Sequence, residues 1–251
     1  MHRGFRYLIV AATIGTLALA GSSHPSQAAV TMPGAVPPVA AVEPVPGAVV
    51  GVAHPVIVTF ANPVIDRAAA ERTITVSAAR QMTGRFEWTD DNVVQWLPDG
   101  FWPAHSTVKV TAAGWKTDFN ASSAVVGVVS ISKHRFTVSI DDQVVRDMPA
   151  SMGKPKHPTP TGTFSAMSKE QSVIMDSRTI GIPLNDPEGY RLTVNWAVRV
   201  TSGGVYVHSA PWSVDQQGVS NVSHGCVNLS PDNAEWYFNT VHIGDPIIVQ
   251  A

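Results

Sequence analysis

The 251-residue sequence predicts a mainly β protein built from two consecutive β-rich units, and three observations support this. Short runs of β-branched residues recur along the chain. The 19 glycines and 19 prolines lie largely between these runs, where they are typical of turns. Charged residues make up 14% of the chain and apolar residues 44%, as in a folded soluble protein. The net charge of -2, with no run of Lys or Arg, argues against nucleic-acid binding.

The first segment, residues 1–29, has the pattern of a signal peptide. Arg3 and Arg6 precede an apolar run, and small residues near Ala28 provide a cleavage site. An uncleaved membrane anchor is the alternative, and with either we expect the remaining chain in the periplasm or cell wall. No cysteine follows the apolar run, which excludes a lipid anchor there. Residues 30–47 are rich in Pro, Ala and Val and predict an extended linker.

Residues 48–122 predict a small β-sandwich of immunoglobulin type. The expected strands lie in the runs HPVIVTF (54–60), RTITVSA (72–78), GRFEWTDDNVVQWLP (84–98) and STVKVTA (106–112). The third run reads as a hairpin that turns at residues 89–92. Short strands at this spacing are typical of such sandwiches. Because the unit holds no cysteine pair and no catalytic cluster, we expect a spacer or docking module.

Residues 124–250 predict a second β-rich unit with one or two helices. Strands are expected on both sides of a turn at Asp141 and Asp142, and again around residues 202–204. A helix is expected over residues 231–241, where Ser230 takes the N-cap position and proline follows at the first helical position. The chain then ends in a further strand within residues 244–251.

The motif SHGCVN contains Cys226, the single cysteine of the sequence. Exported proteins usually carry cysteines in disulfide pairs, so a lone thiol is either buried and inert or used in chemistry. His224 lies in the same motif, and His208 ends the strand-like run GVYVH. An imidazole can take the proton of a thiol, which is the requirement for nucleophilic acyl transfer. Gly225 permits a tight turn whose backbone amides, with that of Cys226, could face an oxyanion.

Two alternatives stay open from these residues alone. One is that Cys226 is a small buried hydrophobic residue with no chemical role. The other is a zinc site formed by His208, His224 and Cys226. Zinc sites favour close ligand pairs, and the one local pair here is His224 with Cys226. We therefore expect no metal and no other cofactor.

The spacing of these residues resembles a family signature. His208 is followed by 14 residues and then by Ser-His-Gly-Cys-Val-Asn at 223–228. This pattern is similar to that of the L,D-transpeptidases, which have a YkuD-type catalytic domain. The segment SMGKPKHPTPTGTF at 151–164 also matches the family, and the resemblance covers residues 124–250. The preceding sandwich and the stretch MDSRTIGIPLN are most similar to the mycobacterial members with an N-terminal immunoglobulin-like domain.

The resemblance implies a YkuD-type β-sandwich catalytic domain after the immunoglobulin-like one, and it assigns roles to residues. Cys226 would be the nucleophile and His208 the general base and acid, oriented by the backbone carbonyl of Ser209. The backbone amides of the turn at His224, Gly225 and Cys226 would stabilise the oxyanion. Substrate contacts are implied for Tyr190, Gly203, Gly204, Ser223, Asn228 and Trp212. Met175 is implied at the cleft or its lid, although core packing is an equal alternative for Met175 and Trp212.

The implied function is an exported L,D-transpeptidase that forms 3→3 peptidoglycan cross-links. A cysteine thioester would carry the acyl group of a tetrapeptide stem to a diaminopimelate side-chain amine, so the new amide forms without ATP. The same thiol would be acylated by carbapenem-type β-lactams. Two other functions stay open: an L,D-carboxypeptidase that uses water as acceptor, and a non-catalytic cell-wall-binding protein.

Overall fold

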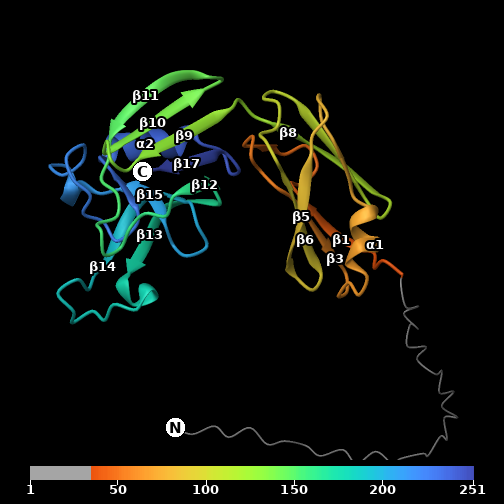
Figure 1. The fold of residues 1–251 in the computed structure, drawn as a ribbon, viewed down its shortest axis with the longest axis horizontal. Coiled ribbons are helices and arrows are strands. Elements are labelled where there is room, and N and C mark those ends of the chain that lie inside the picture. Colours follow the sequence, from red (N-terminus) through yellow and green to blue (C-terminus); the bar gives the residue numbers. More distant parts are fainter. Residues whose placement is uncertain (1–34) are drawn as a thin grey trace, which may run out of the picture. The chain divides into compact units, whose positions relative to one another are not determined.

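The computed structural model describes residues 35–251 (Figure 1). The predicted signal peptide, 1–29, lies outside the described residues, as does the first part of the predicted linker. Within residues 35–251, no helix is both long enough and apolar enough to cross a bilayer.

The first unit is a β-sandwich of two four-stranded sheets, as predicted. One sheet has the order β1 (Val39–Glu43), β3 (Val56–Phe60), β6 (Val93–Pro98), β5 (Gly84–Asp90). The other has the order β2 (Val49–Val50), β8 (Trp115–Ala121), β7 (Thr107–Ala112), β4 (Thr75–Ser77). Phe60, Trp102 and Phe119 are fully buried in the core between them. The predicted hairpin at 84–98 is confirmed, since β5 and β6 pair antiparallel.

Several elements of this unit differ from the sequence-based expectation, and the strands β2 and β8 were not predicted. The ordered sheet begins inside the segment 30–47, because β1 pairs antiparallel with β3. A strand was expected from residue 72, but residue 72 is the last residue of a helix, α1 (Arg67–Arg72). Its consecutive alanines favour a helix, and the side chain of Asp66 caps it by accepting from the Ala69 N–H at 2.9 Å. The strand β4 therefore begins later, at Thr75.

The second unit contains a five-stranded and a four-stranded sheet. The five-stranded sheet has the order β11 (Gln143–Pro149), β10 (Arg135–Ile140), β9 (Val125–Ser130), β17 (Pro246–Gln250), β12 (Gly162–Ser165). The four-stranded sheet has the order β13 (Ser168–Asp176), β14 (Arg191–Arg199), β15 (Tyr206–Ser209), β16 (Val227–Leu229). The helix α2 (Pro231–Thr240) packs against β14 and β15. Buried residues of both sheets and α2 share one core.

Most predicted elements of this unit are confirmed. Asp141 and Asp142 both adopt positive φ, 47° and 65°, in the turn between β10 and β11. The helix α2 begins at Pro231 as expected, but the Ser230 side chain makes no capping hydrogen bond. The strands β12, β13 and β16 were not predicted, and the longest of them is β13. It pairs with β14 along nearly its whole length, and its polar composition conceals the strand in the sequence.

The central feature for function is the parallel pairing of β15 with β16. His208 is opposite Asn228, and Val207 is opposite Val227. Because Cys226 immediately precedes Val227, this register brings the cysteine beside the strand that carries the histidine.

Candidate active site

His208 lies on β15, and one of its two ring nitrogens is engaged in a hydrogen bond with the backbone. Its side chain is buried, and Nδ1 lies 2.9 Å from the carbonyl oxygen of Ser209, as the resemblance led us to expect. A carbonyl oxygen can only accept, so Nδ1 carries the proton and donates. The lone pair of the neutral ring is therefore on Nε2, which is the arrangement a general base needs.

The turn before β16 is fixed by Ser223. Gly225 has φ +118°, a conformation that favours glycine. The Oγ of Ser223 accepts from the Gly225 N–H at 3.1 Å and donates to the carbonyl of Cys226 at 2.6 Å. The Gly225 amide, expected among the oxyanion donors, thus serves the turn itself. No acceptor within residues 35–251 engages the amides of His224 and Cys226.

Thr159 also supports this turn, although sequence analysis assigned it no role. Its buried Oγ1 donates to the carbonyl of Gly225 at 2.8 Å and accepts from the Gly153 N–H at 2.9 Å. Both Gly153 and Thr159 lie in the segment 151–164 that resembles the family, and this was the available signal.

The thiol and the imidazole are both neutral near pH 7. Burial raises the pKa of Cys226 to about 11, an effect that the backbone amide of Tyr206 reduces in part. Burial also lowers the pKa of His208 to about 4. The thiol donates to the carbonyl of Gly204 at 3.8 Å. The sulfur thus rests as a thiol, and proton transfer must accompany its attack.

A cleft of about 370 Å³ opens at the cysteine. The predicted site residues that line it are Cys226, His208, His224, Ser223, Asn228, Tyr190 and Trp212, and Met175 lines it too. Ser209, Gly203, Gly204 and Gly225 do not line it, although Gly204 reaches the sulfur through its carbonyl. Because Cys226 is half-buried and faces this cleft, the inert-burial alternative does not describe it.

Asn228 supports the rim of the cleft. Its buried Nδ2 donates at 3.1 Å to the Oγ of Ser213, which ends the short 3-10 helix η2 (Pro211–Ser213). Trp212 lies in the same helix, with its ring centroid 6.0 Å from that of His208. Trp212 is 54% exposed, which places it at the rim and argues against core packing.

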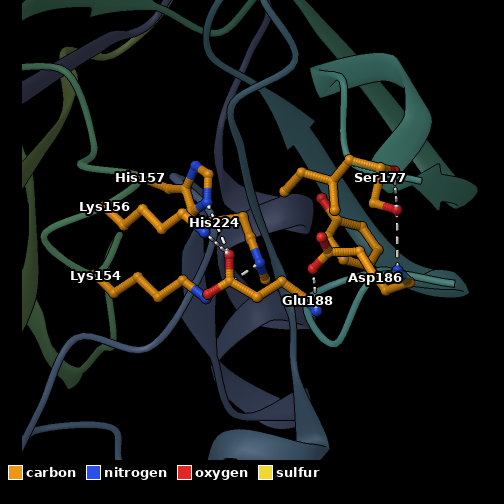
Figure 2. Close-up of polar contacts among 9 residues, drawn as sticks. Lys154, Lys156, His157, Ser177, Asp186, Glu188 and His224 are labelled. Atoms are coloured by element: carbon orange, nitrogen blue, oxygen red, sulfur yellow. Dashed lines mark hydrogen bonds and ion pairs between the residues drawn. The ribbon is translucent and has the colours of Figure 1, made fainter. Parts of the chain in front are cut away.

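The described residues contain one group of three potential metal ligands, and it differs from the zinc alternative. It consists of His157, Glu188 and His224. The ammonium of Lys154 lies between two of them, 2.7 Å from Oε1 of Glu188 and 3.3 Å from Nε2 of His224 (Figure 2). A lysine of the chain itself thus supplies the positive charge at this position. Sequence analysis gave no signal for this contact.

Comparison of the chain with models of known protein families identifies the class of protein to which it belongs. Residues 124–249 match the model of the L,D-transpeptidase catalytic domain, and residues 9–115 match that of a bacterial Ig domain. The chain belongs to the L,D-transpeptidase family, and transpeptidation is an acyl-transfer reaction.

Individual relatives match most or nearly all of the chain. It is 57% identical to L,D-transpeptidase 1 of Mycobacterium tuberculosis over 99% of both chains. The structure of L,D-transpeptidase LdtMt1 in complex with imipenem aligns with a TM-score of 0.83 at 60% identity, covering 86% of this chain and 100% of that one. An L,D-transpeptidase from Mycobacterium smegmatis aligns with a TM-score of 0.84 at 63% identity, with the same coverage.

Proposed function

We propose that the protein is an exported L,D-transpeptidase that forms 3→3 peptidoglycan cross-links through a thioester on Cys226. The observation that carries this proposal is that one cleft holds both the thiol and an imidazole whose Nδ1 is bonded to Ser209, which leaves Nε2 free to act as a base. Family membership supports the transpeptidase reaction, and the geometry supports the roles of individual residues.

In the first half-reaction, Sγ of Cys226 attacks the amide carbonyl before the terminal residue of a tetrapeptide stem. Nε2 of His208 takes the thiol proton as the sulfur–carbon bond forms. The oxyanion is stabilised by the backbone amides of His224 and Cys226, which have no acceptor within the described residues. When the intermediate collapses, the carbon–nitrogen bond breaks and His208 gives its proton to the leaving amine. A tripeptide thioester remains on the enzyme.

In the second half-reaction, a diaminopimelate side-chain amine of another stem attacks the thioester. His208 takes a proton from the attacking amine and returns one to the departing sulfur, so the free thiol is restored. The energy of the thioester passes to the new amide, and no ATP is needed. The apolar side chains of Met175, Leu192 and Val194 in the cleft favour an amine acceptor over water.

Two parts of the proposal rest on the sequence and on relatives. Export is supported by the signal-peptide pattern of residues 1–29, and an exported enzyme would meet its peptidoglycan substrate in the periplasm or cell wall. Carbapenem-type β-lactams would acylate Cys226 by the same attack on a carbonyl. This is supported by the 60% identity with the relative whose structure contains imipenem.

The decisive assay uses a purified tetrapeptide-stem muropeptide with wild-type protein and Cys226→Ala. Mass spectrometry should show a cross-linked dimer and the free terminal residue with wild type, and neither with the variant. Tripeptide with no dimer would establish the L,D-carboxypeptidase instead. If wild type released no product and gained no mass with imipenem, the non-catalytic cell-wall-binding function would replace both.

A further inference from the structure

Glu188 joins two loops beside the active-site cysteine. It lies in the loop 181–190, between the 3-10 helix η1 (Ser177–Ile180) and β14. Its own backbone N–H donates to Asp186 at 2.8 Å, which stiffens this loop. The carboxylate of Glu188 points away from its own loop toward the segment 154–157, where three basic side chains meet it (Figure 2).

The contacts of this carboxylate are short. Oε1 accepts from Nζ of Lys154 at 2.7 Å, and Oε2 accepts from Nζ of Lys156 at 2.8 Å. Nε2 of His157 lies 3.3 Å from the same Oε2. The hydrogen bonds from Lys154 and then Lys156 lower the pKa of Glu188 to about 2, so it is ionised at every working pH.

Shielding from water makes the Lys154–Glu188 pair stronger than the Lys156–Glu188 pair. The side chains of Lys154 and Glu188 are 25% and 27% exposed, whereas that of Lys156 is 69% exposed. Solvent screens exposed ion pairs strongly, and the Lys156 contact therefore contributes less. The Lys154–Glu188 pair at 2.7 Å, shorter than the similarly shielded contact of His157 at 3.3 Å, is the principal link between the two loops.

This link reaches the catalytic turn through His224. Nζ of Lys154 lies 3.3 Å from Nε2 of His224. An ammonium can only donate, so Nε2 accepts, and burial followed by the charge of Lys154 lowers the pKa of His224. The rings of His157 and Tyr190 each lie 5.0 Å from the His224 ring, between centroids. Of the three groups around His224, Lys154 and His157 thus contact Glu188 directly, and Tyr190 lies two residues after it in the same loop.

We propose that Glu188 is a positioning residue that fixes the loop 181–190, with Tyr190, over His224 and the catalytic turn. Without its carboxylate, the loop 181–190 loses its link to the segment 154–157, and Tyr190 is held at the wall of the cleft by its backbone bonds to Ser177 alone. Lys154 also loses its counter-charge beside His224. The effect on substrate binding rests on the proposed transpeptidase function, whereas the effect on the loop does not.

The kinetic test compares Glu188→Gln with a matched control, Asp147→Asn. Asp147 forms an ion pair with Arg135 at 2.7 Å in the same domain, on the strands β10 and β11 and outside the cleft lining. We expect Glu188→Gln to raise KM for the donor muropeptide by about three- to tenfold with kcat within about twofold, and Asp147→Asn to change neither. Added NaCl should raise KM of wild type toward that of the variant and leave the variant unchanged. An unchanged KM, or an equal effect in both variants, would overturn the proposal.

A second measurement does not depend on turnover. Hydrogen–deuterium exchange of the loop 181–190 should be faster in Glu188→Gln than in wild type, while the melting temperature changes no more than in Asp147→Asn. Equal exchange rates in this loop would overturn the proposal even if the muropeptide assay had succeeded. If wild type formed no dimer but exchange increased as expected, the transpeptidase proposal would fail and the role of Glu188 in the loop would stand.

Discussion

The Nδ1 atom of His208 donates to the carbonyl oxygen of the adjacent Ser209 at 2.9 Å, and this one bond fixes the tautomer of the base. A carbonyl brings no formal charge to the imidazole, in contrast to a carboxylate, which would stabilise the imidazolium. Burial therefore acts with little opposition, and the pKa of His208 falls to about 4. The pair of Cys226 and His208 is consequently neutral before substrate binds.

The first prediction concerns the reactivity of the free thiol. With its pKa raised to about 11, about one Cys226 in ten thousand is a thiolate at pH 7. The rate of alkylation by iodoacetamide should be far below that of glutathione at pH 7 and should rise with pH beyond 9. Intact mass spectrometry follows the reaction. A rate that reached a plateau below pH 8 would show a thiolate–imidazolium pair instead.

The second prediction concerns stability in acid. The folded-state pKa of His208, about 4, is below the usual value of 6.5, so between these values the unfolded chain binds a proton that the folded chain does not. Stability contributed by His208 is complete above pH 6.5 and is lost as pH falls toward 4, by about 3 kcal/mol in total. Urea unfolding of wild type and His208→Gln across this range measures it. The variant should show a shallower decline, and parallel curves would refute the assignment.

Elements whose conformation depends mainly on neighbouring residues were predicted correctly from the sequence. The hairpin 84–98 alternates in hydrophobicity, and the start of α2 is marked by Pro231, so both were predicted correctly. The strand β1 was missed because proline and alanine surround it, and its sheet position depends on pairing with β3. The strand β13 was missed because its polar residues give no alternating pattern.

The site likewise combines residues that the sequence predicted with residues that only long-range contacts reveal. Cys226 and His208 were predicted because acyl transfer needs a thiol and an imidazole and because their spacing resembles the family signature. The register of β15 with β16 then places them in one cleft. Thr159 and Glu188 act through contacts that cross the fold. Thr159 reaches Gly225 over 66 positions, and Lys154 reaches Glu188 over 34. No local pattern specifies such pairings.

The third prediction tests Thr159 as a support for the catalytic turn. Thr159→Val preserves the shape but leaves the buried Gly153 N–H and the Gly225 carbonyl without their partner. We expect a loss of about 2–4 kcal/mol in the free energy of unfolding, because unsatisfied buried groups bear their desolvation cost. Imipenem acylation should also be slower. Thr159→Ser, which keeps the hydroxyl, is the control and should lose less than half as much; equal losses would show that the hydrogen bonds are unimportant.

The fourth prediction concerns the backbone at Gly225. A Cβ at this residue would meet no atom nearer than 3.8 Å, so space permits alanine, but φ of +118° does not suit it. Gly225→Ala should cost about 1–3 kcal/mol of stability or shift the turn, and imipenem acylation should fall by at least about tenfold. Gly100→Ala, with open space and no positive φ in the other domain, should leave acylation unchanged. If Gly225→Ala were acylated by imipenem at the wild-type rate, the turn would tolerate another conformation.

The most direct test of the central claim is to trap the acyl-enzyme. Wild-type protein is mixed with a tetrapeptide-stem donor in the absence of an acceptor, quenched in acid, and analysed by intact and peptide mass spectrometry. The account predicts a mass gain equal to the donor without its terminal residue, located on the peptide that contains Cys226 and absent from Cys226→Ala. Dimer formation with no such adduct at any time, or an adduct that persists in Cys226→Ala, would contradict it.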